Sequence, residues 1–109
     1  MWLWLSLLLA SCGARCRPDD GCAACVGPEA RDLCLYDRLQ AIPADRFDTA
    51  WDAAAAITDP VVRGAGVSLW IERAGRQLTR SQQESLCKLL DGSAGDACRR
   101  RAASPHLQR

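Results

Sequence analysis

Apolar residues recur at helical spacing along most of the chain. Residues 28–41 begin with Pro28, which suits the first position of a helix because its missing N–H would have no partner there. This helix is expected to end before Pro43, since the residue before a proline avoids helical geometry. A second helix is expected from Asp45, its N-cap. Its apolar stripe is Phe47, Ala50, Trp51, Ala54 and Thr58.

A third helix is expected from Pro60, with Asp59 as its N-cap. Its stripe follows the i, i+3, i+4, i+7, i+8 pattern: Val62, Ala65, Gly66, Leu69 and Trp70. Val67 and Ile71 lie off this stripe, so either a second helix or a partner protein is expected to cover them. Residues 67–71 could instead form a short strand, although the sequence offers no matching strand to pair with it.

Two further helices follow. Ser81-Gln82-Gln83-Glu84 has the form of a capping box and predicts a fourth helix that stops at Gly92. Ser93 and Asp96 are the expected caps of a last short helix, which ends before Pro105. The predicted fold class is therefore all-α, a small disulfide-stapled bundle of four to five short helices.

A faint internal repeat accompanies these helices. Residues 28–31 and 60–63 share the pattern P-x-x-R at an offset of 32 residues, and each lies at a predicted helix start. Residues 87–98 are a candidate third copy that lacks the proline. Periods in the low thirties are typical of helix–turn–helix arrays, but a four-residue match also arises by chance. A helical-hairpin repeat is thus an open alternative to a plain bundle.

The N-terminal segment ends its apolar run, residues 2–10, at Leu9-Ala10-Ser11-Cys12. This stretch resembles the lipobox of bacterial lipoproteins. The resemblance implies cleavage before Cys12, a diacylglyceryl group on its thiol and acylation of the new terminus with a fatty acid such as palmitate. The run of about ten residues is too short to span a bilayer and has the length of a signal-peptide core. An ordinary secretory signal and a buried N-terminal helix are the alternatives.

This resemblance orders the chain into four parts. Residues 1–11 are expected to be a signal peptide, 12–27 a lipidated cysteine-rich tether, 28–103 the helical domain and 104–109 a frayed C-terminal tail. The expected location is the cell envelope, facing the periplasm or the exterior. Gly13 stands where an Asp would resemble an inner-membrane retention signal, which favours the outer membrane.

The cysteine count agrees with export. The chain has seven cysteines, and lipidation of Cys12 leaves six, an even set suited to disulfides in an oxidising compartment. Only 17 of the 98 residues from Cys12 onward are Leu, Ile, Val or Phe, so a core this poor in large side chains benefits from covalent bridges. The six are Cys16, Cys22, Cys25, Cys34, Cys87 and Cys98. Spacing favours Cys87–Cys98, across a tight turn, and Cys25–Cys34.

The pair Cys22 and Cys25 forms a CxxC motif. A thioredoxin-like redox site would place this motif in strand–helix alternation, which the surrounding sequence lacks. Together with Cys16 and Cys34 the motif could supply four thiolates to zinc, but the second half of the expected ligand pattern is missing. We therefore expect structural cysteines, with no metal and no cofactor.

Other chemistry is sparse. A net charge of +1 argues against a nucleic-acid partner, and the one histidine, His106, lies near the chain end, away from any core where it could act as a base. No serine lies in a G-x-S-x-G context, so the chain is not expected to be an enzyme. Residues 99–101 are three arginines, suited either to anionic lipid headgroups or to a helix C-terminus.

Function follows from these expectations. The favoured hypothesis is a non-enzymatic interaction or accessory module of the envelope, with the lipid bilayer bound through Cys12 and a protein partner indicated by Val67 and Ile71. One alternative is a thiol-redox or metal-binding protein that uses the first four bridging cysteines. The other is a periplasmic inhibitor or chaperone-like binder.

Overall fold

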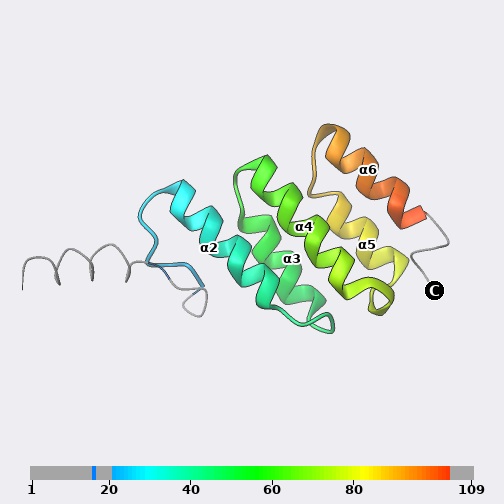
Figure 1. Cartoon of the computed structure of the whole chain (residues 1–109), viewed down its shortest axis with the longest axis horizontal. Helices are drawn as coiled ribbons and strands as arrows, with labels where there is room; N and C mark the ends of the chain where they lie inside the picture. The colour runs from blue at the N-terminus through cyan, green and yellow to red at the C-terminus, as the bar shows by residue number, and fades with distance from the viewer. Residues whose placement is uncertain (1–15, 17–20, 104–109) are drawn as a thin grey trace, which may run out of the picture.

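A computed structural model of the chain describes Cys16 and residues 21–103 (Figure 1). Within these residues there are five α-helices and one 3-10 helix, η2, and no strand. The elements are α2 (Pro28–Ala41), α3 (Phe47–Ala56), α4 (Pro60–Ala74), η2 (Gly75–Gln77), α5 (Arg80–Cys87) and α6 (Gly92–Ala103). The prediction of a small, disulfide-stapled all-α bundle is confirmed, and residues 67–71 are helical rather than extended.

The helices repeat in space as well as in sequence. α2, α4 and α6 begin at Pro28, Pro60 and Gly92, so successive starts are 32 residues apart. In Figure 1 these three helices follow one another with a similar slant, and α3 and α5 connect them. The described residues thus form two helix pairs, α2–α3 and α4–α5, followed by α6. This arrangement is that of a helix–turn–helix array.

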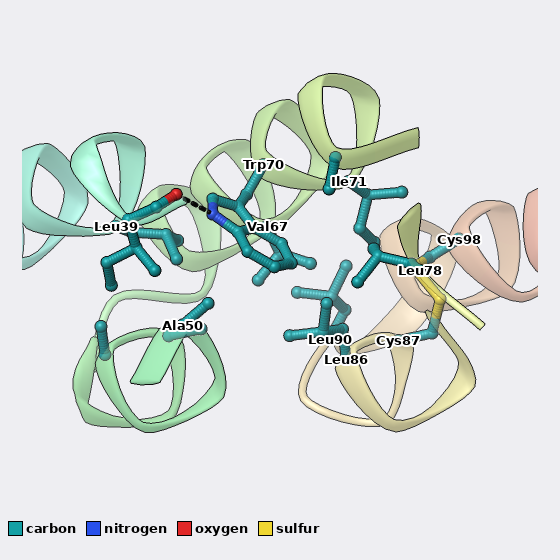
Figure 2. Close-up of a cluster of buried hydrophobic side chains, with 14 of the residues drawn as sticks. Leu39, Ala50, Val67, Trp70, Ile71, Leu78, Leu86, Cys87, Leu90 and Cys98 are labelled. Atoms are coloured by element: carbon teal, nitrogen blue, oxygen red, sulfur yellow. Dashed lines mark hydrogen bonds between the residues drawn. A yellow bond between two sulfur atoms is a disulfide. The ribbon is translucent and has the colours of Figure 1, made fainter. Parts of the chain in front are cut away.

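The main core lies around α4, which packs against α2, α3, α5 and α6. Trp70 is its largest fully buried side chain, and its indole N–H donates to the carbonyl of Ile42 at 2.9 Å (Figure 2). Leu39 reaches this core from α2 and Leu86 from α5. Trp51 is half-buried at its edge, and its indole N–H donates to the Ser85 carbonyl at 3.4 Å. Both tryptophans therefore anchor neighbouring helices.

A second, smaller cluster lies at the N-terminal end of the array. Its buried members are Cys22, Cys34, Leu35 and Ile57. Cys22 and Cys34 are joined by a disulfide, so half of this cluster is covalently linked. A disulfide therefore stabilises the N-terminal end of the domain, whereas Trp70 and aliphatic side chains stabilise its centre.

The buried face of α4 differs from the predicted stripe. Ala65 and Leu69, expected to be buried, are exposed, whereas Val67 and Ile71 are 1% and 8% exposed. The buried set Val67, Trp70, Ile71 and Ala74 itself follows the i, i+3, i+4, i+7 pattern. Two overlapping apolar stripes fit this helix, and the packing of α2 and α5 against α4 selects the one centred on Trp70.

Helix ends differ from expectation at two turns. α3 starts at Phe47 rather than after Asp45, because the N–H of Arg46 bonds the Pro43 carbonyl and closes a turn over the intervening residues. The capping box of α5 is formed by Thr79 and Gln82, two residues before the predicted one. This shift leaves Ser81 and Glu84 inside the helix, where the Glu84 side chain pairs with Arg80.

The boundary between the last two helices also differs from the prediction. α5 ends at Cys87, and Gly92 begins α6 instead of ending its predecessor. The bonds from the N–H of Leu89 to the Leu86 carbonyl and from the N–H of Leu90 to the Cys87 carbonyl close the intervening turn. α6 thereby begins at the residue that the 32-residue period indicates.

Candidate functional site

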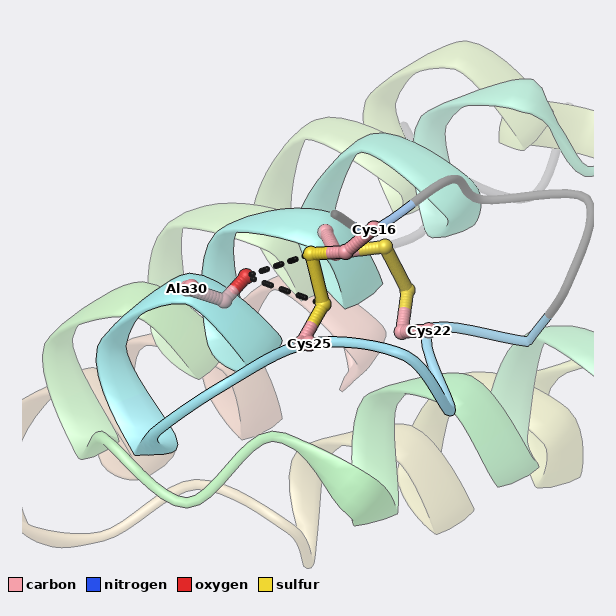
Figure 3. Close-up of a disulfide and its surroundings, with 5 residues drawn as sticks. Cys16, Cys22, Cys25 and Ala30 are labelled. Atoms are coloured by element: carbon pink, nitrogen blue, oxygen red, sulfur yellow. Dashed lines mark hydrogen bonds between the residues drawn. A yellow bond between two sulfur atoms is a disulfide. The ribbon is translucent and has the colours of Figure 1, made fainter. Parts of the chain in front are cut away.

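The first four bridging cysteines are paired as Cys16–Cys25 (Figure 3) and Cys22–Cys34. The favoured Cys25–Cys34 pair is therefore wrong. Each cysteine of the CxxC motif bonds a partner outside the motif. The bridge from Cys22 connects the segment before α2 to that helix, and the bridge from Cys25 connects two parts of that segment. Sequence spacing missed this arrangement because Cys22 adopts a positive φ of 64°, which redirects the chain so that its side chain points toward α2.

The two bridges differ in accessibility. Cys22 and Cys34 are 1% and 6% exposed, whereas Cys16 and Cys25 are half-buried. The carbonyl oxygen of Ala30 lies 3.6 Å from the sulfur of Cys25 and 3.7 Å from that of Cys16 (Figure 3). An external thiol can thus reach the Cys16–Cys25 bridge more readily than the buried one.

These bridges bring sulfur atoms close together. The Sγ atoms of Cys16, Cys25 and Cys34 lie within 4.8 Å of one another, and Cys22 is bonded to Cys34. Four thiolates at this spacing suit tetrahedral zinc, but a disulfide sulfur carries no thiolate charge. The same four residues therefore offer either two disulfides or, after reduction, a candidate metal site.

The third bridge joins Cys87 and Cys98, as the spacing indicated. Cys98 lies 32 residues after Gly66, and both are buried at the seventh position of their helices. Cys34 occupies the same position of α2, so the Cys22–Cys34 and Cys87–Cys98 bridges recur at matching places in the repeat. Each links a helix of the 32-residue series to the segment before it.

Asp32 is a buried carboxylate that sequence reasoning did not single out. It is 3% exposed, and its two oxygens accept hydrogen bonds from the backbone and hydroxyl of Thr58 and from the backbone N–H of Asp59. Burial raises the pKa of this carboxyl, but those hydrogen bonds lower it more, so the pKa falls below the usual 3.8. Asp32 thus fastens α2 to the corner between α3 and α4.

Arg63 has a corresponding role one repeat later. Its guanidinium donates to the carbonyl of Ile57 and, at 3.0 Å, to the carbonyl of Leu89. Ile57 and Leu89 are 32 residues apart and occupy the same place in successive helix-pair corners. Arg63 of the P-x-x-R pattern is therefore structural because it connects the two corners, whereas its counterpart Arg31 is exposed. The sequence signal was present, but the partners of the arginine were not readable from it.

A cleft lies between α4 and α6. It encloses about 270 Å³ and is lined by Ser68, Leu69, Ile71, Glu72, Gln83, Ala94, Ala97, Cys98 and Arg101. A neighbouring hollow continues it along α4 past Val61. Val61 is 79% exposed and Leu69 41% exposed, so the α4 wall of this surface presents apolar side chains to solvent.

The serines and arginines considered in the sequence lie on α4, α5 and α6. Ser68 lines the cleft, Ser81 and Ser85 lie on α5, and the described residues place no histidine near any of them. The arginines 99–101 are exposed in the last turns of α6, where cations suit the negative end of a helix. Cys12, residues 1–11 and the tail 104–109, including His106, lie outside the described residues.

Comparisons with known proteins give no assignment. No protein-family model, curated protein or solved structure matches this chain. In the described part of the chain, none of the helices has the length and apolar character that crossing a membrane requires.

Proposed function

We propose that this chain is an exported, lipid-anchored module that binds a partner protein and performs no catalysis. The support for the anchor is the lipobox-like stretch ending at Cys12. The support for export is that the other six cysteines form three disulfides, which persist in oxidising compartments. The bacterial envelope, with the outer membrane favoured, is the location that fits both features.

The observation that carries the binding role is the exposed apolar surface of α4, where Leu69 lines the α4–α6 cleft and Val61 lines the neighbouring hollow. Val67 and Ile71, which indicated a partner in the sequence, are buried within the monomer and need no partner to cover them, although Ile71 lines the cleft. Exposed apolar side chains beside a concavity are typical of interaction sites, because they gain free energy when a partner removes them from water.

The anchor is tested by expressing the full chain in a bacterial host with an alkyne-bearing palmitate analogue. The expected result is label on the mature protein and its recovery with membranes, both lost in Cys12→Ala. A matched control is Ser6→Ala, which leaves the cysteine intact. Unprocessed chain that retains Met1 and carries no label would overturn the anchor.

The binding role is tested by placing a photo-crosslinking amino acid at Leu69 in the envelope-exported chain. Leu33, a leucine 60% exposed on α2 and outside the cleft, is the matched control position. A discrete adduct from position 69 that is absent from position 33 supports the proposal. Its identity distinguishes a permanent subunit from the substrates of an inhibitor or chaperone-like binder. Equal adducts from both positions would contradict a binding role for this face.

The cysteine cluster favours a second candidate function, thiol-redox exchange or metal binding. The three sulfurs within 4.8 Å are the observation behind it. Intact mass under denaturing, thiol-blocking conditions counts the free thiols of the purified chain, and native mass detects bound zinc. Six cysteines that stay in disulfides in a glutathione buffer, with no zinc bound, would exclude this function, whereas reversible reduction or bound zinc at Cys16, Cys22, Cys25 and Cys34 would support it.

A further inference from the structure

The α4–α6 cleft exists because two equivalent helix junctions differ in a few residues. At the α2–α4 junction Gly66 has no side chain, and a Cβ added there would lie 3.2 Å from side-chain atoms of Tyr36 and Leu39. The equivalent residue of α6 is Cys98, whose side chain lies in this position and lines the cleft. Glycine lets α2 and α4 approach closely, and cysteine keeps α6 farther from α4.

A second difference removes a hydrogen bond that ties neighbouring helices together. The side-chain amide of Gln40 donates to the carbonyl of Gly66 at 3.1 Å and ties α2 to α4. The residue 32 positions later is Glu72, and the equivalent carbonyl belongs to Cys98. A carboxylate donates no hydrogen bond, so this tie cannot form between α4 and α6. Glu72 has no ion pair with the described residues, although it lines the cleft.

Gln83 gives the cleft a polar floor. The residue is 2% exposed and lines the cleft, and its side-chain amide makes no hydrogen bond within the described part of the chain. Because that part contains no fully enclosed polar side-chain atom that lacks a partner, the amide of Gln83 must reach the open space of the cleft. A nearly buried amide costs free energy unless a hydrogen-bonding partner meets it.

These groups specify the chemistry of an occupant. The amide of Gln83 has a donor and an acceptor that complement the C=O and N–H of a peptide unit. Glu72 attracts a cation, and Leu69 with Ala94 offers apolar contact. An α-helix has already paired its backbone N–H and C=O groups internally, whereas an extended segment presents them to the Gln83 amide.

We infer that the cleft binds an extended peptide segment of a partner protein. The backbone of the segment pairs with Gln83, and a Lys or Arg side chain of the segment lies at Glu72. Arg101, on the α6 wall, repels that basic side chain and so directs it toward α4. This inference rests on the proposed binding role and adds the class of ligand and its orientation.

The test uses the full chain labelled with ¹⁵N and the peptides acetyl-Ala-Lys-Ala-amide and acetyl-Ala-Glu-Ala-amide. Gln83→Leu identifies the side-chain NH₂ signals of Gln83 by their loss. The lysine peptide is expected to shift these signals in a saturable way, and the glutamate peptide to bind more weakly. Glu72→Gln should weaken binding of the lysine peptide about three- to fivefold, which is the loss expected for an exposed ion pair. The new side-chain amide can also donate a hydrogen bond to the carbonyl of Cys98 and so narrow the cleft.

Glu84→Gln is the matched control, because Glu84 is exposed on α5 and outside the cleft. The affinity of the Glu84→Gln variant for the lysine peptide should equal that of the unaltered chain. Absence of a shift at Gln83 up to the solubility limit, or equal binding of both peptides, would overturn the inference. A crosslink at Leu69 combined with that negative result would leave the general binding role intact and remove this ligand class alone.

Discussion

The junctions α2–α4 and α4–α6 occupy equivalent places in the 32-residue repeat, but they pack differently. In the first, Gly66 and the Gln40 amide bring two helices into close contact. In the second, Cys98 and Glu72 fill the same positions, and a cleft lies between the helices. A repeat of backbone elements therefore fixes where helices begin but not how closely they pack. The side chains at the crossing point decide the packing.

The corners that accompany these junctions differ in the same manner. Asp32 fastens α2 to the first corner with three hydrogen bonds to its carboxylate. At the equivalent position α4 has Gly64, and Arg63, one residue earlier, connects α4 to the second corner through Leu89. Opposite charges thus perform one task in neighbouring copies, because a corner offers N–H donors on one side and carbonyl acceptors on the other.

The largest expected effect concerns the Cys87–Cys98 bridge, because Cys98 occupies the position at the α4–α6 junction that Gly66 occupies at the α2–α4 junction. Cys87→Ala combined with Cys98→Ala should lower the free energy of unfolding by about 2–4 kcal/mol, because it frees the unfolded chain and leaves space in the core. Urea unfolding followed by circular dichroism measures this loss. A change under about 1 kcal/mol would show that the second junction is stable without its bridge.

Arg63→Met should cost about 2–3 kcal/mol, since it removes charge-assisted bonds to Ile57 and Leu89 and leaves partly buried carbonyls without a donor. Arg63→Lys keeps the charge but cannot reach both corners with one planar group, so it should recover less than half of that loss. The same unfolding measurement compares the two variants. Full recovery by lysine would contradict the bridging role.

Asp32→Asn should cost about 1.5–3 kcal/mol near neutral pH, because the amide loses one acceptor and presents N–H groups to the donors of Thr58 and Asp59. Since folding lowers the pKa of Asp32, its contribution is present above the usual value of 3.8 and is lost as the pH falls through the lowered pKa. Unfolding between neutral pH and pH ~2 should therefore show a smaller acid-induced loss in the variant than in the unaltered chain. Parallel pH profiles would refute this account.

The smallest expected effect is a contrast between two glycines of α4. Gly64→Ala should stabilise the fold by about 0.5–1 kcal/mol, because alanine favours helix and its Cβ would lie an ordinary 3.9 Å from that of Ala94. Gly66→Ala has the same helical gain but presses on Tyr36 and Leu39, so it should be about 1–2 kcal/mol less stable than the first variant. Thermal unfolding of both proteins checks the sign of the difference.

The sequence was informative where a local rule operates. Pro28 and Pro60 predicted the starts of α2 and α4, and Asp59 was correctly expected to cap α4. The 32-residue offset between the two prolines indicated a possible array. The sequence was ambiguous where two apolar stripes share one helix, as on α4, because only the neighbours of Val67 and Leu69 decide which stripe is buried. Asp32 was not predicted, since its partners lie 26 and 27 residues away.

The cleft was even less predictable. It depends on Glu72 differing from Gln40 and on Cys98 differing from Gly66, and these comparisons have meaning only after the helices are aligned in space. Gln83 appeared in the sequence as one residue of an expected capping box. Its place on the floor of the cleft follows from the packing of α5 behind α4 and α6.

Under the proposed lipid anchor, the Cys16–Cys25 bridge would also set how far the array can stand from a bilayer. If Cys12 bears the lipid, as proposed, the first covalent attachment, at Cys16, lies four positions after the anchor, a reach of at most about 14 Å. Reduction of this accessible bridge moves the first attachment to Cys22 and extends the reach to about 35 Å. One exposed sulfur–sulfur bond would then decide whether the helices lie against the lipid headgroups or sample the space beyond them.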